Sequence, residues 1–400
     1  MGLNRKTVHY LFAFSLLLTG GCATARPPAL STAAPTASSS SAITMTLPDS
    51  GTFVRATPDS SDGFTRLAPQ ELLDQARHAA YLLLGEVHTN ACDHAMQADF
   101  LKRLGQAGVS IAVGLEMVSV DLQPVLDDFN AGRLSIDQLP QALDWEHTWG
   151  YDFSLYRPIF ETAAQYGYPL YALNLPKGLA RKYGKVGIEG LPPQERAFLP
   201  APVLPAPDAQ KSMLEDQFKA HMSFLKNRDN APNLDRFIRV QSAWDTTMAT
   251  EAARVHASTH RPVAIIVGNG HVEYGYGIAH RLKTLDPTAR ALLVMPWRGQ
   301  EAPDPKAGDI FFYCPLLHRS RLGYTLSEID NSLHVITVAP QSPAEHAGLM
   351  QDDVILTAND IPITSLADLH KAAITASKND APLVYTVKRG SETVDVTIKR

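Results

Sequence analysis

The sequence has few cysteines, no apolar run long enough to cross a membrane, and no marked excess of charge. Only 3 of its 400 residues are cysteine, and none belongs to a C-x-x-C pair, which excludes a cysteine-rich zinc site. The apolar run near the N-terminus is shorter than the about 20 residues that a membrane-spanning helix needs. The 36 basic and 41 acidic residues are well mixed, which argues against a nucleic-acid-binding surface.

Familiar catalytic motifs are also absent. The chain contains no HExxH, no G-x-S-x-G and no Walker loop, so the absences favour binding over catalysis. Hydrophobic residues make up 45% of the chain, which is enough for a sizeable core in two or three domains. Cys92 and Cys314 either pair in an oxidising compartment or are free buried thiols.

The first 22 residues have the three parts of a cleavable export signal. Arg5 and Lys6 give a basic start, residues 10–18 form a short apolar run, and residues 19–22 read TGGC. This order resembles the signal of bacterial lipoproteins, in which the cysteine after the small residues is lipidated, here Cys22. The match is imperfect, because Thr19 stands where the pattern prefers Leu. An ordinary secretory signal, with Cys22 there by chance, is the alternative.

A lipid on Cys22 would anchor the mature chain, since each buried CH2 group contributes about 0.8 kcal/mol. No Asp follows Cys22, which in the lipoproteins it resembles implies sorting to the outer membrane. Residues 26–41 are mostly Pro, Ala, Ser and Thr without periodicity, which is typical of a flexible tether. We therefore expect a signal over residues 1–22, a tether over residues 23–52, and a lipid-anchored protein that faces the periplasm.

The rest of the chain divides into two regions, residues 53–317 and 322–400. In the first region, short apolar runs without internal charge alternate with longer helical patterns. The runs are residues 81–84, 111–113, 169–173, 263–267 and 291–295. This alternation predicts an α/β fold whose mainly parallel sheet is covered by helices. The stretch 176–261 has helical patterns and no clear strand, which predicts a helical insertion.

Polar side chains fall at the ends of four of these predicted strands. They are Glu86, His88, Glu116, Asn174, Asn269 and His271. In sheets of this kind, ligands bind beyond the carboxyl ends of the strands, so we expect these groups to share one rim. Carboxylates and imidazoles together bind a divalent metal or pass protons. A set of hydrogen-bonded structural residues is the alternative.

Four segments of the first region carry a resemblance to a known family. They read GEVHTN from Gly85, GLEM around Glu116, QSAWDTTMA from Gln241 and GNGHVEYGYGI from Gly268. Together, in this order, they resemble the ChaN family of haem-binding uptake proteins, within the wider Tiki and TraB superfamily. The resemblance covers roughly residues 64–295. It implies haem binding in iron acquisition, tyrosine ligation of the haem iron, and a homodimer that holds haem between two protomers.

The resemblance places Glu86, His88, Glu116 and His271 in the pocket, but no motif identifies the ligand tyrosine. Four tyrosines are candidates by their place in the sequence. Tyr274 and Tyr276 come just after His271, and Tyr151 and Tyr156 follow an aromatic, turn-rich stretch. Ferric iron ligates the phenolate form of tyrosine. Packing in the core is the alternative for each of them, and a covalent haem site is excluded because no C-x-x-C-H occurs.

Asp245 lies in a helical segment whose packing face is formed by Trp244, Met248 and Ala252. The carboxylate of Asp245 either bonds a rim residue or is solvated. For the region as a whole, haem binding is the first hypothesis. A metal-dependent hydrolase of the Tiki type that uses the Glu and His rim is the second, and a scaffold with an inert rim is the third.

The second region has the pattern of a small β-rich domain with one helix at residues 365–376, capped by Ser365. SPAEHAGL from Ser342, followed by DDVIL from Asp352, resembles a bacterial PDZ domain. The resemblance implies that the backbone N–H groups of Leu322, Gly323 and Tyr324 receive the terminal carboxylate of a peptide, which adds as a strand to the sheet edge. The expected partner is a peptide C-terminus or an envelope protein, and an unused groove is the alternative.

Replacing the expected lipid acceptor tests the anchor. Cys22→Ser should release the protein from membranes into the soluble envelope fraction, because the tether has no other apolar anchor. Fractionation of cells that express each form, followed by immunoblotting, measures this. Unchanged membrane retention of the variant would contradict the lipoprotein hypothesis.

Overall fold

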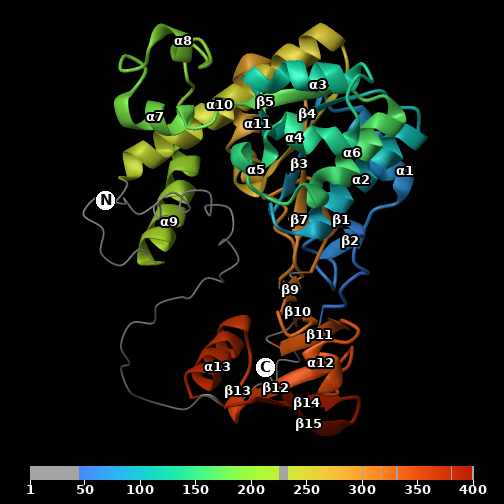
Figure 1. Cartoon of the computed structure of the whole chain (residues 1–400). Helices are drawn as coiled ribbons and strands as arrows, with labels where there is room; N and C mark the ends of the chain where they lie inside the picture. Colours follow the sequence, from blue (N-terminus) through green and yellow to red (C-terminus); the bar gives the residue numbers. More distant parts are fainter. Residues whose placement is uncertain are drawn as a thin grey trace, which may run out of the picture. The chain divides into compact units, whose positions relative to one another are not determined.

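The computed structural model describes residues 45–224, 233–299, 301–315, 317–329, 332–379 and 381–398 (Figure 1). Cys22 and most of the expected tether lie outside these residues. The chain forms two compact units. One runs to Pro296 and includes Pro303–Phe312, and the other comprises Trp297–Ala302 and the chain from Tyr313 onward. Within the described ranges, no helix is both long and apolar enough to span a membrane.

The first unit is built on an eight-stranded sheet with the order β2-β1-β8-β7-β3-β6-β4-β5. Its strands are β1 (Phe53–Ala56), β2 (Phe64–Arg66), β3 (Tyr81–Glu86), β4 (Ala112–Ser119), β5 (Leu170–Asn174), β6 (Val263–Gly268), β7 (Ala291–Trp297) and β8 (Ile310–Tyr313). The five predicted strands are all present, and β7, β3, β6, β4 and β5 pair in parallel. The predicted α/β fold is confirmed. The short strands β1, β2 and β8 were not predicted.

The two central strands explain why the sheet forms where it does. Every residue of β3 and of β6 is buried, and only the last residue of β3, Glu86, is charged. Strands covered on both faces need such continuous apolar runs. Tyr81 pairs with Val263, and the parallel register continues to Glu86 opposite Gly268. The two motif loops of the sequence therefore leave the sheet side by side.

Helices cover the sheet. They are α1 (Pro69–Arg77), α2 (Ala91–Gln106), α3 (Gln123–Asn130), α4 (Leu139–Ala142), α5 (Trp145–Thr148), α6 (Phe153–Tyr166), α7 (Leu179–Val186), α8 (Pro193–Arg196), α9 (Asp208–Phe224), α10 (Leu234–Thr259) and α11 (Ile278–Leu285). Short 3-10 turns occur at η2 (Val120–Leu122), η3 (Ile136–Gln138), η4 (Asn269–His271) and η5 (Glu273–Gly275).

The predicted helical insertion is α7 to α10, which follow β5 (Figure 1). It has a small core of its own, formed mainly by leucines between α7 and α10. Side-chain caps mark several helix starts, as the sequence pattern of Asn and Asp suggests. Asn90 caps α2, Asp152 caps α6, and Asn233 caps α10.

β4 is longer than the apolar run at residues 111–113 predicts. β4 continues to Ser119, so Glu116 lies within the strand and does not follow it. The reason is a register shift: Leu115 pairs with Ala172, and the next pair is Ser119 with Asn174. Extra residues in one strand bend it and redirect its side chains, which is how a strand residue comes to lie at the rim. Glu86 and Asn174 differ from Glu116, because each is the last residue of its strand, β3 and β5.

The second unit contains an antiparallel sheet, as predicted. Its elements are β9 (Leu317–Arg319), β10 (Tyr324–Ile329), β11 (Ser332–Val338), α12 (Pro343–His346), β12 (Val354–Ala358), β13 (Ile361–Pro362), α13 (Leu366–Lys378), β14 (Leu383–Arg389) and β15 (Glu392–Ile398). Ser365 caps α13, with its Oγ accepting from the N–H of Asp368 at 3.2 Å. Arg389 makes a bidentate ion pair with the buried carboxylate of Asp353, both distances being 2.7 Å.

Cys92 and Cys314 are both disulfide-bonded. Of the two alternatives that the sequence left open for these residues, free thiols are therefore wrong. Disulfide bonds persist in oxidising compartments such as the bacterial periplasm and are rare in the cytosol.

The core of the sheet gives a test of the fold. Leu83 is fully buried in the middle of β3, so Leu83→Ala should lower the free energy of unfolding of the first unit by about 2–5 kcal/mol. Leu285→Ala is the matched control, because Leu285 is 41% exposed and the change should cost less than about 0.5 kcal/mol. Urea unfolding of the full chain measures both, and equal losses would contradict the strand assignment.

Candidate functional site

A buried carboxylate, Glu86, stands at the end of β3 and is 1% exposed. Its Oε1 accepts from the hydroxyl of Tyr156 at 2.9 Å and lies 2.6 Å from Nδ1 of His88. Nδ1 of His94 is 2.6 Å from Oε2 of Glu86, which is close enough for an ion pair. The angle between the two groups is not that of a hydrogen bond. Burial alone would raise the pKa of Glu86, but His94 and His88 outweigh it and lower the pKa well below its usual range. Glu86 is therefore a carboxylate held by three partners.

The start of α2 holds the loop that carries His88. Asn90 caps the helix, and Asp93 in its first turn accepts from the N–H of Val87 at 2.8 Å. His94, one position further, is 3.2 Å from the carbonyl of His88 through its Nε2. The GEVHTN motif therefore folds as strand, tight loop and capped helix, and its polar groups bond one another.

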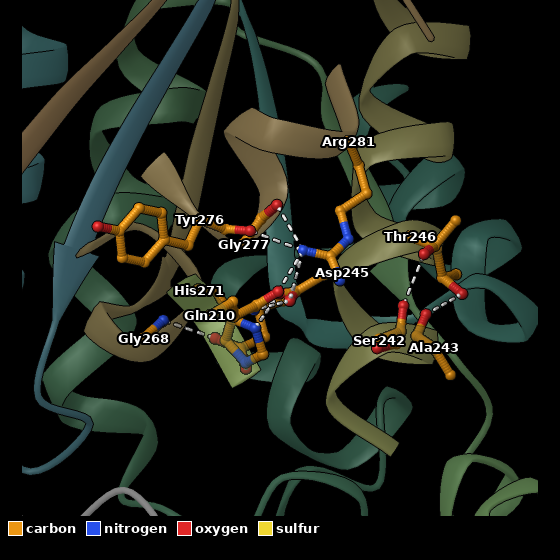
Figure 2. Close-up of polar contacts among 12 residues, drawn as sticks. Gln210, Ser242, Ala243, Asp245, Thr246, Gly268, His271, Tyr276, Gly277 and Arg281 are labelled. Carbon is orange, nitrogen blue, oxygen red and sulfur yellow. Dashed lines mark hydrogen bonds and ion pairs between the residues drawn. The ribbon is translucent and has the colours of Figure 1, made fainter. Parts of the chain in front are cut away.

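A second cluster joins Glu116, His271 and Asp245, and Figure 2 shows its His271 and Asp245. His271 lies in η4, directly after β6, with Nδ1 2.6 Å from Asp245 and Nε2 3.4 Å from Glu116. Glu116 also accepts from the N–H of Gly268 at 2.7 Å. Burial alone would lower the pKa of His271, but the carboxylates of Glu116 and Asp245 outweigh it and raise the pKa to about 10. His271 is therefore a cation between two anions.

Arg281 and Gln210 support the far side of Asp245 (Figure 2). Arg281 is fully buried and donates to the side-chain oxygen of Gln210 at 2.5 Å and to the carbonyl of Tyr276 at 2.7 Å. It lies 3.5 Å from Asp245, which also accepts from Gln210 at 2.6 Å. These contacts connect α9, α10 and α11 and fix the carboxylate that orients His271.

Gly268 allows the two clusters to approach each other. A Cβ atom at this position would lie 2.9 Å from Cε1 of His88 and 3.6 Å from Oε2 of Glu116. Any side chain here would therefore push His88 away. A Cβ on Gly85 would lie 2.7 Å from Oδ1 of Asn269, so the glycine of the other motif is needed for the same reason.

Aromatic rings surround His88. The ring of Trp149 is 4.8 Å from that of His88 and meets it edge-on, and the ring of Tyr151 is 5.0 Å away. Tyr151 also borders a hollow of about 540 Å³ that is lined by residues between Pro140 and Phe153. Among the tyrosine candidates, Tyr151 is thus in contact with the rim and with open space.

The other tyrosine candidates lie differently. Tyr156 is fully buried and bonded to Glu86, and burial followed by the charge of Glu86 raises its pKa far above its usual range. Tyr274 and Tyr276 stack on each other, with ring centroids 5.4 Å apart. The side chain of Asn174 is directed to the backbone, donating to the carbonyl of Glu116 at 2.8 Å, so it supports the strand end.

Several polar residues of the site were not predicted. His94, Gln210 and Arg281 had no motif to identify them, and Asp245 was left between two alternatives. Asp245 bonds the rim residue His271 and is fully buried, so the solvated alternative is wrong. For His94 a signal existed, because it stands in the first turn of the helix that Asn90 caps.

A metal centre was the other expectation for the rim. In the part of the chain that the structure describes, no group of three or more His, Cys, Asp or Glu side chains is arranged to hold a metal ion. The carboxylates instead bind imidazoles of the protein: Glu86 binds His88 and His94, while Glu116 lies beside His271.

The fold and site define an α/β protein with buried carboxylate–imidazole pairs at the ends of its central strands. Residues 72–282, more than half of the chain, match the family model described as haem-binding uptake, Tiki superfamily, ChaN. The chain belongs to this family. It is similar in fold to the Campylobacter jejuni ChaN structure described as showing cofacial haem binding, with a TM-score of 0.51 and 18% identity, covering 65% of this chain and 95% of that one.

Residues 320–399 match the PDZ domain model, and the chain carries this domain at its C-terminal end. The chain is 39% identical over 71 residues to serine protease HTRA1B of Danio rerio, which is 18% of this chain but only 14% of that protein. It is also similar to the HtrA3 PDZ domain bound to the phage-derived ligand FGRWV, with 28% identity and a TM-score of 0.16, covering 18% of this chain and 64% of that one.

The charge on His271 predicts how stability depends on pH. Its pKa of about 10 lies above the ordinary value, so its stabilising effect is complete below about pH 6.5 and is lost as the pH rises toward 10. His271→Gln should lower the free energy of unfolding by about 3–5 kcal/mol at pH 6.5, because it removes the cation that lies between two buried carboxylates. The deficit relative to wild type should shrink as the pH approaches 10.

Thermal unfolding at a series of pH values measures this effect. His280→Gln is the control, since His280 is exposed on α11 and should show no such deficit. A deficit for His271→Gln that stays constant from pH 6.5 to 10 would contradict the charged state of His271.

Proposed function

We propose that this protein is a lipid-anchored envelope protein that binds haem for iron acquisition, with Tyr151 as the iron ligand, and that its PDZ domain docks a partner. The observation that carries the ligand assignment is the place of Tyr151. It lies against His88 and borders a hollow whose volume, about 540 Å³, is in the range of small-molecule sites.

The chemistry of the other candidates favours the same assignment. Tyr156 has no exposed surface, and its hydroxyl is bonded to Glu86, so an iron ion could reach it only after the cluster opened. Tyr156 instead positions Glu86. Tyr274 and Tyr276 are partly exposed but contact each other, and their rings have no described contact with His88.

The surroundings of Tyr151 determine the state of its phenol. Burial, then the charges of Glu116 and Glu86, raises the pKa of Tyr151 to about 12. The phenol is therefore protonated at neutral pH, and it loses its proton to solvent only when a strong Lewis acid takes up the electron pair of the oxygen. Bound haem would supply a ferric ion that accepts the phenolate. His88, oriented by Glu86, packs beside the ring and limits its movement.

The location is proposed on two grounds. The N-terminal segment has the order of a lipoprotein signal ending at Cys22, followed by residues that imply the outer membrane. The disulfide-bonded state of Cys92 and Cys314 is compatible with the periplasm. We therefore propose an outer-membrane anchor that leaves both units in the periplasm.

Haemin titration tests the ligand. Haemin should give a shifted Soret band with the full chain, and Tyr151→Phe should abolish the tyrosinate charge-transfer band. It should weaken haem binding by at least about 10- to 100-fold, the cost of altering even an outer-shell partner of a metal. Tyr274→Phe is the matched control and should keep the spectrum. Circular dichroism checks that both variants fold.

One outcome would change the proposed ligand, and another would replace the proposed function. If His271→Ala removes haem while Tyr151→Phe and the other Tyr→Phe variants keep it, histidine is the ligand. If haemin never binds and a metal-loaded sample cleaves peptides, the hydrolase hypothesis replaces haem binding. Metal analysis of the purified protein accompanies both measurements.

A further inference from the structure

The edge of the PDZ domain that would receive a peptide is already paired. β10 follows the loop of Leu322 and Gly323, and it pairs with β11 along one side. Along its other side it pairs with β9, in antiparallel register, with Thr325 opposite Arg319 and Ser327 opposite Leu317. Both edges of β10 are therefore occupied by strands of the same chain.

β9 also runs in the direction that a bound peptide would take. A peptide that joins a PDZ domain adds as an antiparallel strand and ends with its carboxylate at the loop. β9 is antiparallel to β10 and likewise ends at this loop, where it continues into Ser320.

Ser320 places two oxygens on the loop that would hold a carboxylate. Its carbonyl accepts from the N–H of Gly323 at 3.1 Å, and its Oγ accepts from the N–H of Leu322 at 3.1 Å. These N–H groups are two of the three that the motif assigns to the peptide carboxylate. The carbonyl and hydroxyl of one serine thus satisfy donors that two carboxylate oxygens would otherwise satisfy.

The loop that follows this segment is closely packed. A Cβ at Gly323 would lie 2.1 Å from Cβ of Ser342, so only glycine fits at this position of the loop.

We propose that residues 317–320 form an internal ligand of the PDZ domain, which an incoming peptide C-terminus must displace. The inference deepens the proposed docking function and rests on it. The internal ligand is suited to displacement, because β9 has only three paired residues, Leu317 is 46% exposed and His318 is exposed. The apparent affinity for a peptide is reduced in proportion to the fraction of molecules whose edge is free.

Proline at position 318 tests the proposal in the full-length protein. Proline has no N–H to donate to the ladder, so His318→Pro should detach β9, whereas His318→Ala keeps the N–H and is the matched control. The probe is a fluorescent FGRWV peptide with a free carboxylate, beside its C-terminal amide. His318→Pro should bind the free peptide about tenfold more tightly than wild type or His318→Ala, as expected if about a tenth of wild-type molecules are open.

Ser320→Ala gives a second, milder variant, since it removes only the oxygen that accepts from Leu322. It should strengthen peptide binding in the same direction. Equal affinity of all four proteins for the free peptide would overturn the internal ligand while leaving peptide docking intact.

Amide hydrogen exchange across Tyr324–Ile329 tests whether β9 covers the edge of β10, and it needs no peptide. Exchange should be faster in His318→Pro than in His318→Ala, because one edge of β10 is then exposed. Equal exchange would overturn the proposal. Faster exchange without binding of the peptide would support the internal ligand and refute docking of that peptide.

Discussion

The first unit depends on keeping one ionised carboxylate, that of Glu86, inside the protein. Removing a charge from water costs several kcal/mol, which only close partners offset. His88, His94 and Tyr156 come from a loop and from two helices, α2 and α6. These elements must therefore keep fixed positions at the end of β3. The place of Tyr151 beside His88 follows from this constraint, since the loop before α6 carries Tyr151.

The second cluster also stabilises buried charges by pairing them with charges of opposite sign, but anions and cations exchange places. In the first, two imidazoles surround one carboxylate; in the second, the carboxylates of Glu116 and Asp245 surround one imidazole, that of His271. Gly268 lies beside both clusters, since a Cβ there would be 2.9 Å from Cε1 of His88 and 3.6 Å from Oε2 of Glu116. Burial of Arg281 behind Asp245 adds a cation on the side away from the rim. A buried network of this kind is rigid when its charged groups are paired, and the loss of one member leaves the others at a high cost in free energy.

The sequence allowed the strands to be predicted wherever a run of apolar residues is continuous, as in β3 and β6. It did not reveal the irregularity in β4, because the register shift that redirects Glu116 depends on pairing with β5. The motif residues of the rim were found since they stand next to glycines at strand ends. Gln210 and Arg281 were missed because their contacts join helices that are far apart in sequence. No local pattern records such a contact.

The PDZ domain shows a related limit of sequence motifs. The residues Leu322, Gly323 and Tyr324 identify a loop with backbone donors, but they do not say what those donors bind. Ser320 stands two residues before Leu322, and a short turn brings its oxygens onto the N–H groups of Leu322 and Gly323. Local contacts need little chain entropy to form, so a nearby segment competes effectively with a partner in solution. Under the proposed docking, a partner peptide must gain more from its side-chain contacts along β10 than the three residues of β9 provide, and this requirement would select among C-termini.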